Sequence, residues 1–167
     1  DFIDPYQPDQ KVAEVYPDKA PKTVENFLQY VRDKHYEGTI FHRVIPNFMI
    51  QGGGYDARYI EPPTRAPVIH EGLEALSKGG PRNTVGTLAM ARTNVPNSAT
   101  AQFFINVVDN GFLDPNAQQP GYTVFGKVVS GMDVINRIRA IPTSFGGPFP
   151  TDVPRTQVVI KSATVLP

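Results

Sequence analysis

Proline and glycine recur along this whole chain, and they limit the length of any regular element that it can form. Its 167 residues include 17 Pro and 14 Gly. Proline removes a backbone donor and glycine favours turns, so this spacing is typical of many short strands and not of a helical bundle. The sequence therefore predicts a mainly β protein. With 40% hydrophobic residues it is expected to form one core and one domain over residues 1–167.

Two segments carry the periodicity of a helix. In residues 20–33, Pro21 suits the first helical position, and apolar residues recur at the spacing of one helix face. In residues 130–140, Ser130 is a candidate N-cap and a shorter apolar stripe follows it. The apolar faces comprise Val24, Phe27, Leu28 and Val31 in the first helix, and Val134, Ile135 and Ile138 in the second.

The remaining apolar segments are short, and most are bounded by Gly, Pro or Asn, which predicts strands. The expected strands are residues 39–44, 48–51, 87–91, 101–107, 122–129 and 157–165. Two helices are too few for alternating βαβ units, so the expected fold is antiparallel, either a closed barrel or a sandwich, capped by the helices. Residues 52–83 have little strand character, and loops of that length in a compact domain usually serve function.

Charge and residue content argue against several classes of function. Sixteen Lys and Arg balance sixteen Asp and Glu, so no net field attracts nucleic acid, and no apolar run is long enough for membrane insertion. The absence of Cys excludes disulfides and thiolate chemistry. The histidines His35, His42 and His70 lack a metal-binding spacing, so neither a metal nor an organic cofactor is expected. His42 is interpreted as a hydrogen-bonded structural residue.

Two other common signatures are incomplete. No serine lies in a GxSxG elbow, which argues against a serine nucleophile with a local motif. The run Gly52, Gly53 and Gly54 follows a strand, but neither Lys-Ser/Thr nor a helical pattern follows it. A phosphate cradle needs both, so the three glycines are interpreted as a flexible or tight turn.

One cation stands inside an apolar segment, FHRVIPNFMIQGGG at residues 41–54. Arg43 lies there among Phe48, Met49 and the amide of Gln51. An arginine on an apolar strand is costly unless it is paired, so Arg43 reaches solvent, pairs with an acid, or serves function.

A second segment, residues 86–107, brings a polar and an aromatic side chain to one strand face. Gln102 and Phe104 share that face by the period of two, whereas Phe103 and Ile105 point to the other.

These segments resemble the cyclophilins, a family of peptidyl-prolyl cis–trans isomerases. The motifs are FHRVIPNFMIQGG at 41–53, GTLAMARTNVPNSATAQFFIN at 86–106, and FLD at 112–114 followed by GYTVFGKVVSGMDV at 121–134. DKAPKTVENF at 18–27 agrees, and the resemblance covers residues 13–166. It implies a closed eight-stranded antiparallel β-barrel capped by two α-helices, with accelerated rotation of X–Pro bonds in unfolded or extended polypeptides as its function in protein folding.

The resemblance also implies the residues of the site. Arg43, the arginine of the FHR motif, is implied to be catalytic, and ten further positions are implied to form the pocket for the substrate proline. These are Phe48, Met49, Gln51, Ala91, Arg92, Gln102, Phe104, Phe112, Leu113 and Tyr122.

Three of these positions depart from the eukaryotic pattern. Phe112 and Tyr122 stand where eukaryotic members carry Trp and His, and the pair is similar to bacterial, periplasmic-type cyclophilins. It implies weak cyclosporin binding and a periplasmic location, with the bacterial cytoplasm as the alternative. Arg92 stands where Asn is common, which keeps the backbone contact and changes the charge at the rim.

The N-terminal segment departs most from the family. AEVY at 13–16 is its only clear strand, and Pro5 and Pro8 precede it. Either the first strand is irregular, or part of the family's opening hairpin is missing and a sheet edge is exposed. The resemblance implies a monomer, whereas an incomplete hairpin would invite strand exchange between chains. HEGLEALSKGG at 70–80 is a candidate for an extra helical turn.

The implied reaction needs no covalent chemistry. Rotation about X–Pro must overcome about 18–20 kcal/mol of lost amide resonance, so a catalyst must bind the twisted amide better than either planar form. The guanidinium of Arg43 can donate to the prolyl nitrogen as its lone pair appears. Gln51 is expected to orient Arg43 or the substrate carbonyl, and Gln102 to hold the peptide backbone. The ring would sit in an apolar cup of Phe48, Met49, Phe104 and Leu113.

A second hypothesis is a peptide-binding, chaperone-like module. In that case peptide affinity would persist without Arg43.

Overall fold

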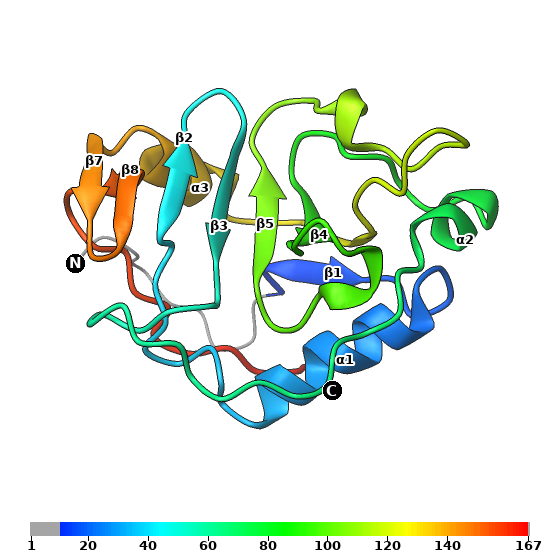
Figure 1. Cartoon of the computed structure of the whole chain (residues 1–167), viewed down its shortest axis with the longest axis horizontal. Coiled ribbons are helices and arrows are strands. Elements are labelled where there is room, and N and C mark those ends of the chain that lie inside the picture. The colour runs from blue at the N-terminus through cyan, green and yellow to red at the C-terminus, as the bar shows by residue number, and fades with distance from the viewer. Residues whose placement is uncertain (1–10, 167) are drawn as a thin grey trace.

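The computed structural model describes residues 11–166, so Pro5 and Pro8 lie outside the described residues. The helices and strands follow one another through the chain as drawn in Figure 1. The strands are β1 Ala13–Val15, β2 Arg43–Ile45, β3 Met49–Gly52, β4 Thr87–Met90, β5 Phe103–Asn106, β6 Val124–Val128, β7 Thr143–Gly146 and β8 Phe149–Pro154. The α-helices are α1 Pro21–Arg32, α2 Gly72–Ser77 and α3 Met132–Arg139, and short 3-10 helices span Pro96–Ser98 and Gly111–Leu113.

The described strands form two antiparallel sheets and not one closed barrel. Six strands pair in the order β1-β6-β4-β5-β3-β2, and β7 pairs only with β8. The hairpin β7–β8 lies beside β2 (Figure 1), at the edge where a barrel would close. Pro150 and Pro154 lack backbone donors, and the positive φ of Asp152 (68°) breaks the extended path. Strand β8 therefore cannot offer β2 a regular ladder, and the expected eight-stranded closure is wrong.

Residues 11–166 contain three α-helices where two were expected, because the 70–80 segment contains α2, the extra helical turn. Helix α1 begins at Pro21 as predicted, and Ala20 at its N-cap provides no side-chain hydrogen bond. The carboxylate of Glu71 instead accepts hydrogen bonds from the backbone of Lys22 (3.2 Å) and Thr23 (2.7 Å). A residue far along the chain thus satisfies the free N–H groups of the first turn. No helix in residues 11–166 is long and apolar enough to cross a membrane.

The predicted cap of α3 is wrong. Gly131 occupies the N-cap position with φ 94°, a conformation that suits glycine. Ser130 Oγ donates to the carbonyl of Lys11 (2.9 Å) and so ties the entrance of α3 to the start of β1.

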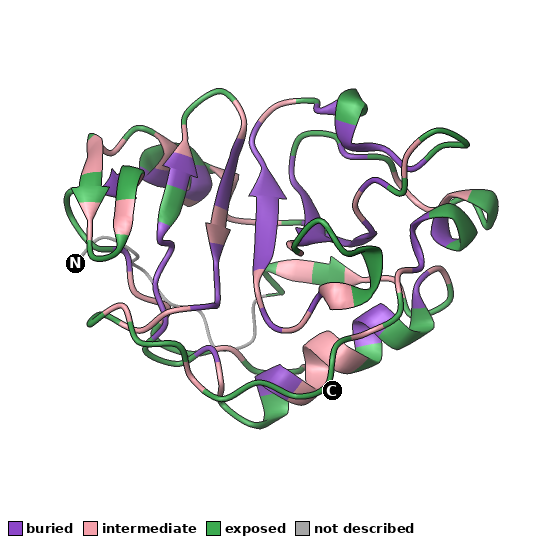
Figure 2. Cartoon of the chain, viewed as in Figure 1, coloured by how far each residue is buried: buried purple, intermediate pink, exposed green. Residues whose placement is uncertain are grey.

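The large sheet separates two groups of buried side chains. The major cluster contains Phe103 and Ile105 and is covered by α1 and α3. The minor cluster consists of Met49, Ala89, Phe104, Leu113 and Val124. Phe104 therefore faces away from its two neighbours, as the period of two predicted, and β5 is buried along its whole length (Figure 2). Both faces of this central strand exclude water.

Most of the predicted strands are confirmed with shorter or shifted bounds, and one of them is wrong. Strands occur in segments 48–51, 87–91, 101–107 and 122–129, whereas segment 39–44 is a strand only from Arg43. Residues 157–165 form no strand: they make a single bridge, Ile40 to Val159, and a few backbone hydrogen bonds to residues 38–41. Hairpin β7–β8 was not expected, since four prolines between residues 142 and 154 concealed it.

Candidate active site

A row of cross-strand partners crosses the face of the large sheet that carries the minor cluster. Arg43 lies opposite Gln51, and Gln51 lies opposite Phe104. Phe104 is opposite Ala89, which is opposite Val124. Side chains of directly opposed residues project from the same face of a sheet. The strand register thus places these five side chains on one surface.

Arg43 stands at the solvent end of this row and is held by an amide. Its Nη1 donates to Gln51 Oε1 (3.3 Å), and Gln51 Nε2 donates to Gln102 Oε1 (2.8 Å). Among the described residues no carboxylate forms an ion pair with Arg43. The exposed guanidinium is therefore oriented without being neutralised.

The three glycines at the end of β3 and just after it allow this arrangement by close packing. Gly53 has a positive φ (86°), and a Cβ at residue 54 would lie 2.4 Å from the Gln102 side chain. Gly54 therefore leaves the space in which Gln102 reaches Gln51. The turn is tight, one of the two alternatives considered from the sequence.

An apolar cup adjoins the amides. Met49, Phe104 and Leu113 are buried in the minor cluster, and Phe48, Ala91 and Tyr122 pack against it while remaining partly exposed. The Tyr122 ring meets Phe104 edge to face, with centroids 5.6 Å apart. Phe112 stacks on Phe48 at 5.7 Å and is 67% exposed, so it forms the open rim.

Arg92 turns its guanidinium toward the loop that carries Tyr122. Nε and Nη2 donate to the carbonyl of Gly121 (3.1 and 2.6 Å), and Nη1 donates to that of Thr93 (2.8 Å). Its charge lies 4.5 Å from the centre of the Tyr122 ring. These contacts use most of the donors of Arg92 within the protein, so its side chain holds the rim together.

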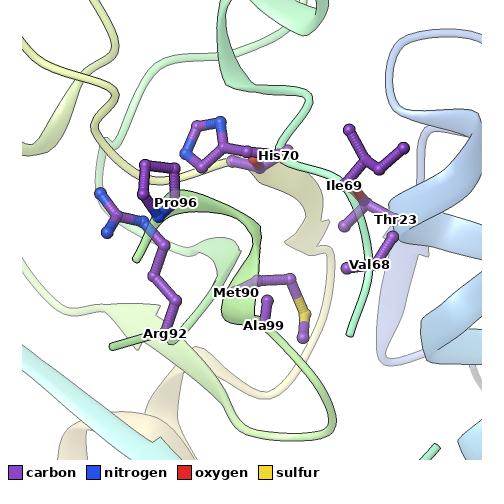
Figure 3. A pocket seen from close by; sticks show the side chains of 9 residues that line it. Thr23, Val68, Ile69, His70, Met90, Arg92, Pro96 and Ala99 are labelled. Atoms are coloured by element: carbon purple, nitrogen blue, oxygen red, sulfur yellow. The ribbon is translucent and has the colours of Figure 1, made fainter. Parts of the chain in front are cut away.

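A cavity of about 10 Å³ lies behind the rim, lined by Arg92, His70, Met90 and Pro96 among others (Figure 3). This volume holds about one water molecule. It is far too small for a proline ring. No group of three or more acidic or histidine side chains in residues 11–166 is arranged to hold a metal.

His42 is structural, but its Nδ1 lacks the hydrogen bond that was expected of the side chain. The residue is 4% exposed, Nδ1 has no partner, and the ring packs against Tyr55 (4.8 Å) and Phe149 (5.3 Å). The apolar rings around it supply no acceptor. Burial, and secondarily the charge of Arg43, lower the pKa of His42 from 6.5 to about 4.

The lowered pKa of His42 predicts an acid-sensitive fold. Between pH 6.5 and about 4 the unfolded chain binds a proton at His42 that the folded chain does not. The free energy of unfolding should therefore fall as pH falls through this window, by about 3 kcal/mol from this group, and stay free of its influence above it. Urea denaturation of wild type and His42→Phe at pH 7 and pH 4 measures the effect. Equal losses in both proteins would contradict it.

Sequence reasoning missed a set of buried amides beside the cup, Asn83, Asn106 and Asn110. Asn106 lies two residues after Phe104 on β5, so the period of two already placed it on the cup face. A polar residue on that face was the available signal.

Comparison with known proteins shows the family to which the chain belongs. The sequence model of the family described as Cyclophilin type peptidyl-prolyl cis-trans isomerase/CLD matches residues 8–165. The chain is 51% identical over 152 residues to a peptidyl-prolyl cis-trans isomerase of Acinetobacter baylyi, which covers 91% of this chain and 78% of that protein. It is 50% identical to peptidyl-prolyl cis-trans isomerase B of Escherichia coli, with 92% of each covered.

The fold agrees as well. A cyclophilin type peptidyl-prolyl cis-trans isomerase of Cryptosporidium parvum, solved in the presence of the dipeptide Ala-Pro, superposes with a TM-score of 0.71 at 25% identity. The match covers 93% of this chain and 91% of that one. The chain therefore belongs to the cyclophilin-type peptidyl-prolyl cis–trans isomerases.

Proposed function

We propose that this isomerase binds proline-containing segments of unfolded or extended polypeptides over the minor cluster, with Arg43 as its catalytic residue. One observation carries the proposal: an exposed guanidinium, oriented by Gln51 and neutralised by no described carboxylate, stands beside an apolar cup. The Cryptosporidium parvum relative was solved with Ala-Pro, which supports a ligand of this kind on this fold.

The geometry suits a twisted amide better than a planar one. In the planar amide the prolyl nitrogen has no free lone pair, so Arg43 gains little from it. As the bond twists, the lone pair becomes available and the fixed donors of Arg43 stabilise it. Because the guanidinium stays protonated, no proton has to be transferred.

The cup holds the proline ring, and the amide side chains hold the rest of the peptide. Met49, Phe104 and Leu113 hold the pyrrolidine ring, while the preceding carbonyl rotates on the solvent side. The apolar surface lowers the local dielectric and strengthens the contact of Arg43 with the substrate. Gln102 stays beside Gln51 and offers its backbone and amide to an extended peptide.

Peptide titration followed by NMR tests the location of the site. An Ala-Pro tetrapeptide should shift the amide signals of Ala91, Gln102 and Phe104, because these residues surround the cup. Signals of Asp33, Lys34 and Arg65, which line a separate hollow of about 560 Å³, should stay unchanged. A shift map centred on that hollow would contradict the proposed site.

The same proposal includes a periplasmic-type bacterial enzyme acting in the periplasm as a single-domain monomer. Phe112 and Tyr122 at the rim support this subclass, and they also support weak cyclosporin binding, because no indole is present to contact the drug. Cell fractionation tests the location, and cyclosporin titration of the isomerase activity tests the affinity.

A further inference from the structure

Beneath the cup lies a group of buried amides that takes no part in the chemical step proposed for Arg43. The amide network is defined here as Asn83, Asn106 and Asn110 together with Thr87 and Asp114. The three asparagines are each at most 3% exposed. Polar groups at this depth are costly unless every donor and acceptor is satisfied.

The network is centred on Asn106, at the end of β5. Asn106 Oδ1 accepts from Asn110 Nδ2 (2.8 Å). Asn106 Nδ2 donates to Asn83 Oδ1 (3.0 Å) and to Thr87 Oγ1 (2.9 Å). Asn83 in turn donates through its backbone and side chain to Asp114 Oδ1 (2.7 and 3.0 Å). The side chains thus join segments that are distant in sequence.

Asn110 connects this network to both walls of the cup. Its Nδ2 donates a second hydrogen bond, to the backbone carbonyl of Phe48 (2.9 Å). Its own carbonyl accepts from the backbone of Leu113 (2.9 Å). Asn106 lies directly opposite Met49 across β3 and β5. Asn110 thus contacts Phe48 and Leu113, and Asn106 pairs with Met49, so two asparagines hold three residues of the cup.

We propose that Asn110 and Asn106 are positioning residues for the isomerase reaction, which set the separation of the Phe48 and Leu113 walls around the substrate proline. The inference rests on the proposed site. Phe48 lies in the turn before β3, where its carbonyl also accepts from Val107 N (3.2 Å), and Leu113 lies in a 3-10 segment. The amide network adds a side-chain hydrogen bond to this short backbone pairing.

Only an amide satisfies the position of Asn110. Its Nδ2 donates two hydrogen bonds to two acceptors, Phe48 O and Asn106 Oδ1. A carboxylate of the same shape would face both acceptors with its own lone pairs and push the wall outward. Once protonated, the same carboxyl regains one O–H donor. In a variant with a carboxyl group at this position, pH therefore decides whether the side chain can donate a hydrogen bond.

The test compares kcat and KM of wild type and Asn110→Asp on an Ala-Pro peptide between pH 5 and pH 8. At pH 8 the variant should lose about tenfold in kcat/KM, the scale of one or two lost hydrogen bonds. Its activity relative to wild type should recover toward pH 5, as the introduced carboxyl becomes protonated. Asn110→Ser, whose hydroxyl is too short to reach Phe48 O, should show a similar loss at every pH.

Two controls separate the possible outcomes. Glu71→Gln exchanges a buried carboxylate for an amide at the start of α1 and should lower stability while leaving kcat/KM and its pH profile unchanged.

Arg43→Ala reports on the site itself. If Arg43→Ala is inactive but Asn110→Asp and Asn110→Ser match wild type at every pH, the positioning role is overturned and the site stands. If Arg43→Ala keeps full activity, the site falls. Should Asn110→Asp fail to fold, Asn110→Ser alone decides.

Discussion

Arg43→Ala is expected to slow catalysed X–Pro isomerisation by about 100-fold or more, with the native fold retained. Removal of one preorganised donor to a transition state costs about 10²–10³ in rate. Arg43 is exposed at the edge of the large sheet and contributes one side-chain hydrogen bond, at 3.3 Å, to Gln51. Its loss therefore removes the proposed donor to the transition state and disturbs little packing.

The measurement is a protease-free isomerisation assay at about 10 °C, where the uncatalysed reaction takes minutes. Arg43→Lys is a graded variant: it keeps the charge but loses the planar donors, so an intermediate rate is expected. Arg155→Ala, at an exposed position outside the proposed site, should behave as wild type. Full activity in a folded Arg43→Ala protein would contradict the catalytic role, and persistent peptide affinity without activity would separate binding from catalysis.

Gly121→Ala is expected to be the most damaging single-methyl change near the site. Gly121 has a positive φ (64°), and a Cβ there would lie 2.5 Å from Pro115 N, 2.6 Å from Leu113 O and 2.7 Å from the Asp114 carbonyl carbon. All three neighbours are backbone atoms, so no side chain can turn away. Strain at positive φ adds to the clash, and a loss of about 3 kcal/mol or more in unfolding free energy follows.

The same change should also lower activity, because the loop carries two parts of the rim. Tyr122 N donates to Leu113 O (3.0 Å), and the carbonyl of Gly121 accepts from Arg92. Gly111→Ala is the matched control, since a Cβ at that position meets only Asp114 Oδ2, at 3.9 Å. Thermal unfolding and the isomerisation assay on both variants give the comparison. A Gly121→Ala protein as stable as Gly111→Ala would show that the loop relaxes freely.

Local patterns in the sequence were sufficient for much of the fold. The period of two on β5 correctly assigned Phe104 to one face and Phe103 and Ile105 to the other. The AP start and the apolar stripe located α1, because both signals lie within one helix. The β7–β8 hairpin was not predicted, because its prolines indicated a break in the strands. The two short strands nevertheless pair with each other.

The arrangement of the candidate site depended on contacts that no local pattern contains. The sequence by itself determined which side chains are available: a single guanidinium in the FHR segment, an aromatic and an amide on one face of β5, and a run of three glycines that predicts a turn. These follow from residue type and strand period, which act over a few positions.

Only the tertiary structure decided how those groups meet. Cross-strand register placed Arg43, Gln51 and Phe104 in one row. It also left β2 and β8 without a ladder between them, so the sheet stays open. The unpartnered Nδ1 of His42 and the amide network under the cup arise in the same way. Burial and hydrogen bonding between residues tens of positions apart depend on which strands pack together, and that is a property of the whole fold.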